Sequence, residues 1–166
     1  MTAMRSERLR IESLTRDEAA AIRADDRRGR AWAVDYPSDG DRIVAGVIGE
    51  AGEHYDETSE IGVYQLRLVE DGSAIGGIGF LSAPVDGEAE IGYGLVESAR
   101  SRGYATEALR AVLHHAAQHD VRSVVALTDI DNRASQAVLQ RVGFARDGEV
   151  VTEDGVMLRW ELALQR

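Results

Sequence analysis

The residues best suited to chemistry form one short run, Arg100-Ser101-Arg102-Gly103-Tyr104-Ala105-Thr106. Gly103 lets the backbone pass close to a ligand because it has no Cβ. The helix predicted to open there leaves its first amides without intrahelical partners, and its dipole adds partial positive charge. Arg100 and Arg102 add fork-shaped donors that suit phosphate oxygens. The run therefore predicts a phosphate or pyrophosphate site, although a tight turn with a helix cap and two solvated arginines would use the same residues.

Three strands and a helix must position this run. The apolar segments are separated by Asp71-Gly72 and by Pro84 to Gly87, which are typical of antiparallel hairpins. An amphipathic helix follows Gly103, and a continuous apolar stretch then predicts a buried strand. The strands expected up to this point are Leu9–Leu14, Val63–Val69, Ala74–Leu81, Glu88–Leu95 and Val121–Leu127. The order predicts an antiparallel meander followed by a β-α-β unit around the run.

The remaining helices are predicted from their caps. Thr15 fits a helix N-cap with Glu18 at the capping-box position, and that helix should reach about Ala24. A second helix should start near Ser38 or Asp39. Its inward-facing residues should be Ile43, Val44, Val47 and Ile48. A third should span Asn132 to Val142 and end at Gly143, before a last hairpin of Ala145–Val151 and Val156–Leu164. Residues 1–166 thus read as one α/β (α+β) domain.

Composition excludes several kinds of function. The chain has 166 residues and a formal net charge of −10, which argues against nucleic acid as a general partner. It has no cysteine, so a thiolate nucleophile, a disulfide and a cysteine metal site are all excluded. It has no lysine either, which removes the lysine of a nucleotide P-loop. No stretch has the length and apolarity of a membrane span or targeting segment, so a cytoplasmic protein is expected.

Two motifs carry a resemblance to a known family. The run Arg100 to Ala105 resembles the acyl-CoA pyrophosphate motif of the GNAT superfamily of N-acetyltransferases, Arg/Gln-x-x-Gly-x-Gly/Ala. The segments Glu90 to Val96 and Asn132 to Phe144 are similar to the RimJ/RimL-like branch of ribosomal-protein alanine acetyltransferases. The resemblance extends over Leu66 to Leu164 and implies a mixed, mostly antiparallel sheet of about seven strands with flanking helices.

The resemblance also implies roles for single residues. Backbone groups of Leu95 and Val96 would contact the pantetheine arm of acetyl-CoA, the co-substrate, near a place where two strands splay apart. Asn132 would hydrogen-bond the pantetheine, and Ser135 would lie near the sulfur. The residues that would hold the pyrophosphate are Arg100, Arg102, Gly103, Tyr104, Ala105 and Thr106. Leu139 stands where other branches have a tyrosine that protonates the departing thiolate, so Ser135 or a water must do so.

The expected reaction is direct transfer of an acetyl group to a primary amine in a ternary complex, because no cysteine exists to carry it. Glu90 is the candidate base, and the amide of Val96 is expected to stabilise the oxyanion. Glu90 could instead be a surface residue paired with an arginine. The amine could belong to a protein N-terminus or a small molecule, and the acyl group could be longer than acetyl. A CoA-binding regulatory domain without catalysis is the alternative function, and a homodimer is compatible with the resembling branch.

Two groups of residues allow both a functional and a structural interpretation. Trp32 and Tyr36 could line an amine pocket or cap the core. His115 and His119 lie four residues apart on a helix, as in metal sites. No acidic third ligand accompanies them at a recognised spacing, so the sequence favours a solvated face and no metal.

Overall fold

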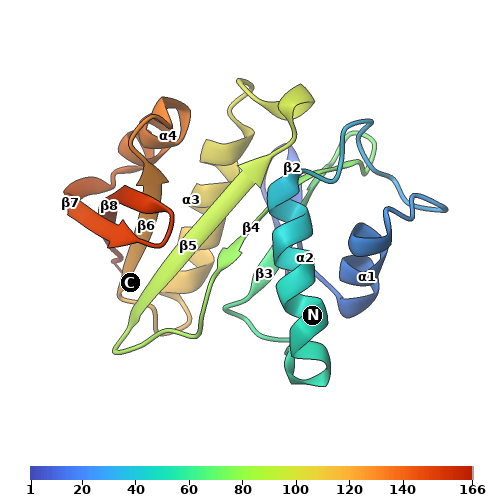
Figure 1. Ribbon diagram of the computed structural model, residues 1–166, viewed down its shortest axis with the longest axis horizontal. Coiled ribbons are helices and arrows are strands. Elements are labelled where there is room, and N and C mark those ends of the chain that lie inside the picture. The colour runs from blue at the N-terminus through green and yellow to red at the C-terminus, as the bar shows by residue number, and fades with distance from the viewer. Residues whose placement is uncertain (166) are drawn as a thin grey trace.

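The fold is one eight-stranded sheet in the order β1-β2-β3-β4-β5-β6-β8-β7, with helices on both faces (Figure 1). The computed structural model describes residues 1–165. Neighbouring strands are antiparallel except for β5 and β6, which run parallel. The strands are β1 (Ala3–Arg5), β2 (Leu9–Ser13), β3 (Val63–Leu68), β4 (Ala74–Phe80), β5 (Glu88–Leu95), β6 (Ser123–Asp129), β7 (Ala145–Thr152) and β8 (Gly155–Ala163).

Two pairs of helices cover the sheet. In Figure 1, α2 lies in front of β3 and β4 with α1 beside it, and α3 lies behind β5. The helix α4 packs beside α3. The helices are α1 (Arg16–Ala24), α2 (Asp39–Ala51), α3 (Tyr104–Ala117) and α4 (Arg133–Val142), with short 3₁₀ turns at Gly52–His54 and Glu97–Ala99. No helix within residues 1–165 is long and apolar enough to cross a membrane.

Local sequence signals place the helix ends as predicted. The Thr15 side chain accepts from the Glu18 amide at the start of α1, and Ser38 forms a reciprocal capping box with Asp41 at the start of α2. Asn132 caps α4, and Gly143 ends it in the left-handed conformation with φ 114°. The meander, the last hairpin and the β-α-β unit are also confirmed.

Three details of the sequence prediction are wrong. The sheet has an additional strand, β1, which pairs with β2 in a segment that looked merely charged. Ile43 and Val47 of α2 are exposed, because the helix turns Ala45 and Ile48 to the sheet instead. Glu18 does not close a capping box, since its carboxylate points into the core and binds Trp32 and Gln65.

The pairing between β5 and β6 is short, and this positions the site. The two strands pair only from Glu88 to Glu90 against Ser123 to Val125. Beyond Glu90, β5 pairs only with β4, while β6 continues along β8. The strands therefore part, and one edge of β5 from Ile91 to Leu95 is left without a neighbouring strand.

Candidate active site

The turn between β5 and α3 presents a row of free amides. Gly103 is the residue before the first turn of α3 and has φ 83°, and Ser101 has φ 62°. Both values lie in the left-handed region, which turns the chain sharply into the helix. The backbone N–H groups of residues 101–106 have no acceptor within residues 1–165, and the first intrahelical bond runs from Glu107 to Gly103. These amides are available to an anion at the positive end of the helix dipole.

Arginines surround these amides. Arg100 donates from Nε to the Leu95 carbonyl at 3.1 Å, and Arg102 has no ion-pair partner within residues 1–165. Arg8, which the sequence did not indicate, comes from the β1–β2 turn: its guanidinium lies 4.5 Å from the centre of the Tyr104 ring and donates to the Arg102 carbonyl. Glu107 balances Arg8 at 2.7 Å. The positive charge of Arg8 could not have been placed beside these amides from the sequence, because the β1–β2 turn was not predicted.

A cavity of about 150 Å³ occupies the gap between the parted strands. Asn132 and Ser135 line it together with Tyr93. The Asn132 side chain already caps α4 through the Ser135 amide at 3.1 Å, and its amide nitrogen has no acceptor within residues 1–165. The cap and a ligand contact therefore use different atoms of the same side chain.

Tyr93 and Ser135 form a hydrogen-bonded pair that the sequence did not reveal. The two hydroxyl oxygens are 2.9 Å apart, although the residues come from β5 and α4. Burial raises the pKa of Tyr93, and its hydrogen bond with Ser135 opposes this in part. The phenol therefore keeps its proton near neutral pH and can deliver it through the Ser135 hydroxyl.

The predicted role of the Val96 amide is wrong. This N–H donates to the Ile75 carbonyl at 2.9 Å and is buried in the β4–β5 ladder. The Glu90 carbonyl faces β4 in the same way, since it accepts from Leu81. Because backbone groups alternate sides along a strand, the N–H and C=O of Leu95 face the gap instead. The backbone role that the sequence resemblance implied for Leu95 is compatible with this direction and stays a prediction.

A second cavity of about 270 Å³ lies between α2 and strands β3 to β5. Its floor is built of glycines in β4 and β5, which leave space where side chains would stand. At Gly77, a Cβ would meet Asp41 Oδ1 at 3.1 Å. Asp41 Oδ2 accepts from the Ser38 amide and hydroxyl at 2.9 and 2.7 Å, so Oδ1 is left to face the cavity. Burial raises the pKa of Asp41, and the Ser38 bonds lower it less.

Of the two residues predicted to contact the substrate, only one lines this cavity. Tyr36 lines this cavity, and its hydroxyl accepts from Gln65 at 2.9 Å. Trp32 lies outside the lining; it is 8% exposed and donates from Nε1 to Glu18 at 2.7 Å. The structural interpretation that the sequence left open therefore holds for Trp32. Glu18 is itself a buried acid whose cluster with arginines was not foreseen.

Glu90 lies on the cavity side of β5 but outside its lining. Side chains alternate along a strand, so Glu90 shares its face with Gly92, about 7 Å away along the strand. The carboxylate has no hydrogen bond or ion pair within residues 1–165, so the predicted surface pairing with an arginine is absent from this part of the chain. Tyr93 between two glycines, and Asp41 three residues after a capping serine, were the available signals for the residues that were missed.

A model of a known protein family matches most of the chain. The model described as acetyltransferase (GNAT) domain matches residues 8–145. A ribosomal-protein-serine acetyltransferase of Escherichia coli is 41% identical over 66 residues, which are 39% of this chain and 37% of that relative. The chain thus spans well under half the length of this curated relative.

Solved structures match over nearly the whole chain. An acetyltransferase from Agrobacterium tumefaciens has a TM-score of 0.70 and 27% identity, covering 98% of this chain and 94% of its own. A GNAT-family acetyltransferase from Bordetella pertussis has a TM-score of 0.70 and 24% identity, covering 97% and 99%. RimL, a ribosomal L7/L12 alpha-N-protein acetyltransferase in complex with coenzyme A, has a TM-score of 0.69 and 20% identity, covering 98% of each chain. The last two likenesses concern the fold.

Proposed function

The chain belongs to the GNAT acetyltransferase family, and from this premise we propose that it transfers an acetyl group from acetyl-CoA directly to a primary amine. The enzyme class predicted from the sequence, an acetyl-CoA-dependent N-acyltransferase, agrees with the family. The observation that carries the proposal is the row of free amides at residues 101–106, placed beside the gap between β5 and β6.

Coenzyme A would lie across both features. The pyrophosphate binds the amides of residues 101–106, with Arg100 and Arg102 as charged donors. The pantetheine arm enters the gap and bonds to backbone groups of Leu95 and to the amide of Asn132. A groove beside Thr106 is lined by Arg8, Arg110 and Arg141, and this groove would accept the phosphate on the adenosine end. No metal takes part in this proposal.

The chemistry needs a base, an oxyanion donor and an acid. The amine is mostly protonated at neutral pH and must lose a proton before its nitrogen attacks the thioester carbon. Asp41 of α2 is suited to act as the base because it lines the second cavity with one free oxygen. Glu90 of β5 is the competing candidate. The Leu95 amide stabilises the oxyanion. When the carbon–sulfur bond breaks, Tyr93 protonates the thiolate through Ser135.

The acceptor we propose is the N-terminal amine of a ribosomal protein. Support comes from the Escherichia coli relative, which is a ribosomal-protein-serine acetyltransferase, and from the shape of the second cavity. The cavity is largely apolar with one carboxylate, which suits a small side chain next to an ammonium group. Exposed Ile43 and Val47 flank it on α2 and offer apolar surface to following residues of a peptide.

Calorimetric titration with coenzyme A tests the first half of the proposal. We expect one site per chain in the wild type and a loss of affinity of at least about tenfold in Arg100→Glu/Arg102→Glu, because both donors and their charge are reversed. Arg146→Glu, an exposed arginine of β7, is the control and should bind normally. Equal affinity in all three proteins would contradict the proposal.

Turnover tests the second half. Release of free thiol from acetyl-CoA is followed with peptides that copy ribosomal-protein N-termini, alongside an aminoglycoside and a polyamine. We expect turnover with a peptide, and none once its N-terminus is blocked. Coenzyme binding without turnover on any amine would instead favour the regulatory domain. The homodimer predicted from the resemblance is tested separately by sedimentation equilibrium.

A further inference from the structure

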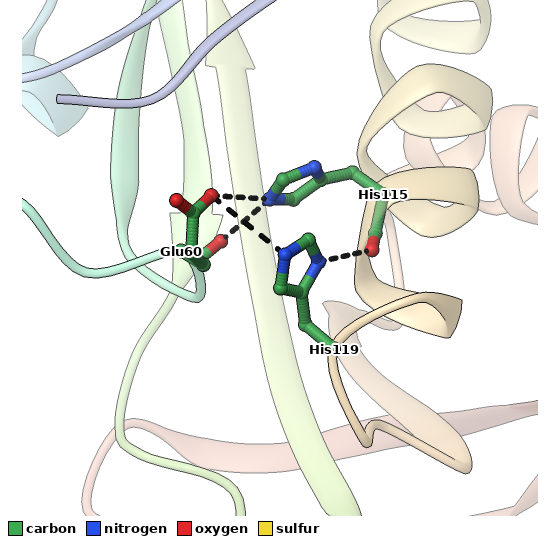
Figure 2. A group of neighbouring side chains, drawn as sticks. All are labelled: Glu60, His115 and His119. Carbon is green, nitrogen blue, oxygen red and sulfur yellow. Dashed lines mark hydrogen bonds and ion pairs between the residues drawn. The ribbon is translucent and has the colours of Figure 1, made fainter.

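Three potential metal ligands meet on the side of the molecule where α3 ends (Figure 2). Glu60 comes from the loop before β3, His115 from the last turn of α3, and His119 from the turn that follows it. The His115 Nε2 atom lies 3.2 Å from Glu60 Oε2, and the His119 Nε2 atom lies 3.9 Å from the same oxygen. One ligand atom from each residue lies within 4.8 Å of the other two.

Each imidazole ring is held by a hydrogen bond to a backbone carbonyl. His119 Nδ1 lies 2.9 Å from the His115 carbonyl oxygen, as Figure 2 shows. A carbonyl only accepts, so Nδ1 carries the proton and the neutral ring directs the Nε2 lone pair toward Glu60. Such a bond to the far nitrogen is typical of metal-binding histidines. His115 Nε2 lies 2.9 Å from the Glu60 carbonyl oxygen, so without a metal this nitrogen carries the proton and donates to it. To bind a metal through Nε2, the ring moves that proton to Nδ1, which has no partner within residues 1–165.

The carboxylate is held in place as well. Thr2, which is 8% exposed, donates from its hydroxyl to Glu60 Oε2 at 2.8 Å. A groove lined by Glu60 and His119 opens beside the cluster, so a metal ion can reach it from solvent.

We propose that Glu60, His115 and His119 form a binding site for a divalent transition metal of the zinc type. Two imidazoles and one carboxylate are a ligand set that Zn²⁺ uses, with a water in the fourth position. At Zn–N and Zn–O distances of about 2.0–2.1 Å, tetrahedral ligands are roughly 3.3 Å apart. The His115–Glu60 separation of 3.2 Å matches this value, and the His119–Glu60 separation of 3.9 Å would have to shorten slightly. Two imidazole nitrogens disfavour Mg²⁺ and Ca²⁺, which prefer oxygen ligands.

This site corrects one premise of the sequence analysis. No acidic partner was expected for the histidine pair, yet Glu60, 55 positions before His115 in the chain, lies beside it. The expectation of no metal is therefore open to test. At 1.5 Å per residue, the site lies about 17 Å along α3 from the free amides. A metal there would therefore stabilise the fold and would not take part in acetyl transfer. It would fasten the loop before β3, and through Thr2 the N-terminus, to α3.

Calorimetry with ZnCl₂ on the full chain, made without a polyhistidine tag, tests the proposal. We expect one Zn²⁺ per chain, and bound Co²⁺ should show the intense visible bands of tetrahedral coordination. His115→Ala and His119→Ala should each weaken binding by more than ~10-fold, since even the loss of an orienting partner costs that much. Glu60→Gln should weaken it similarly. At a hundredfold excess over Kd, Zn²⁺ should raise the Tm of the wild type by roughly 5–10 °C.

His114→Ala is the matched control. His114 is the neighbouring residue on α3, but its ring contacts Gln118 and takes no part in the cluster. This variant should bind Zn²⁺ like the wild type. The circular dichroism spectra of all the variants should match that of the wild type, which shows that they fold and keeps the test independent of the proposed function. Wild-type binding no tighter than that of the double variant His115→Ala/His119→Ala, or an equal loss in His114→Ala, would overturn the site.

Discussion

The hydrogen-bonded hydroxyls of Tyr93 and Ser135 form the proposed route by which the departing thiolate is protonated. Ser135 lies on the α4 side of the gap and has an ordinary alcohol, which is a poor acid. Tyr93 holds a more acidic proton behind it, and burial keeps that proton in place until a thiolate appears. The pair thus offers a route to the leaving group in a chain that has leucine at the position of the usual tyrosine.

Tyr93→Phe and Ser135→Ala should each lower kcat by about 100-fold, the lower range for removal of a general acid. The KM for acetyl-CoA should change little, because neither hydroxyl is proposed to hold the cofactor. The double variant should be no slower than the slower single variant, since the two groups act as a unit. Steady-state kinetics on the three proteins checks this, and losses that multiply in the double variant would argue for separate roles.

Two carboxylates lie near the acceptor cavity, the second cavity between α2 and strands β3 to β5 in which the amine is proposed to bind, and they differ in their surroundings. Both side chains are half-buried, but Asp41 accepts two bonds from Ser38 and has a pKa raised by burial, whereas Glu90 has no hydrogen-bond or ion-pair partner within residues 1–165. A base must be deprotonated, so the activity of an Asp41-dependent enzyme falls as pH drops through that raised pKa. Asp41→Asn should remove this acidic limb from the kcat/KM profile and lower its plateau by about 100-fold.

Glu90→Gln provides the comparison for Asp41. If Asp41 is the base, the Glu90 variant should keep the acidic limb where the wild type has it. If Glu90→Gln instead lost the acidic limb of the kcat/KM profile and Asp41→Asn kept it, Glu90 would be the base, as the sequence predicted. Circular dichroism on Asp41→Asn separates a catalytic effect from loss of the capping box at α2.

At the scale of elements, the N-terminus of α3 is held by a clamp from the β1–β2 turn. Glu107 accepts from the Ser6 hydroxyl, the Arg8 amide and the Arg8 guanidinium, each at 2.7 Å. Burial alone would raise the pKa of Glu107, but these bonds outweigh it and the net shift is downward. The clamp therefore fixes the helix whose free amides are proposed to hold the cofactor.

The lowered pKa of Glu107 makes the clamp sensitive to acid. The folded protein binds a proton at this group less readily than the unfolded chain, so its stabilising contribution is present above the unfolded pKa of 4.5. That contribution is lost as pH falls through the lower folded value. Urea unfolding between about pH 5 and about pH 3 should show a shallower loss of stability in Glu107→Gln than in the wild type. Identical slopes would exclude the clamp as a contributor.

At the scale of the whole molecule, a buried ionic network joins the first helix to the sheet. Glu18 of α1 is 8% exposed and pairs with Arg30 and, at 3.2 Å, with Arg67 of β3. It also accepts from Trp32 and Gln65. The network lies beneath the acceptor cavity and connects the loop after α1 to the strands that form the cavity floor.

Glu18→Ala should lower the free energy of unfolding by about 3–5 kcal/mol, because two arginines lose a buried partner. Asp17→Ala is the control on the neighbouring residue: Asp17 also pairs with Arg30, but its side chain is 85% exposed, so it should cost less than about 1 kcal/mol. Chemical denaturation of both variants measures the difference. Equal losses of unfolding free energy in the two variants would mean that the buried network does not stabilise the fold.

The sequence by itself determined the features that depend on a few neighbouring residues. The caps at Thr15, Ser38 and Asn132, the hairpin turns, and the left-handed glycine before α3 follow from local hydrogen bonds and φ preferences, which act over three or four positions. The motif proposed to bind phosphate could be recognised for the same reason, since one continuous segment supplies its amides and arginines.

Only the tertiary structure decided which distant residues meet. Tyr93 reaches Ser135, Glu60 reaches the two histidines, and Glu18 turns away from its own helix end toward Arg67. The sheet also decided that the Val96 amide is taken by Ile75, because strand register sets which backbone groups are paired. Such contacts depend on how helices and strands pack, which spacing along the chain does not encode.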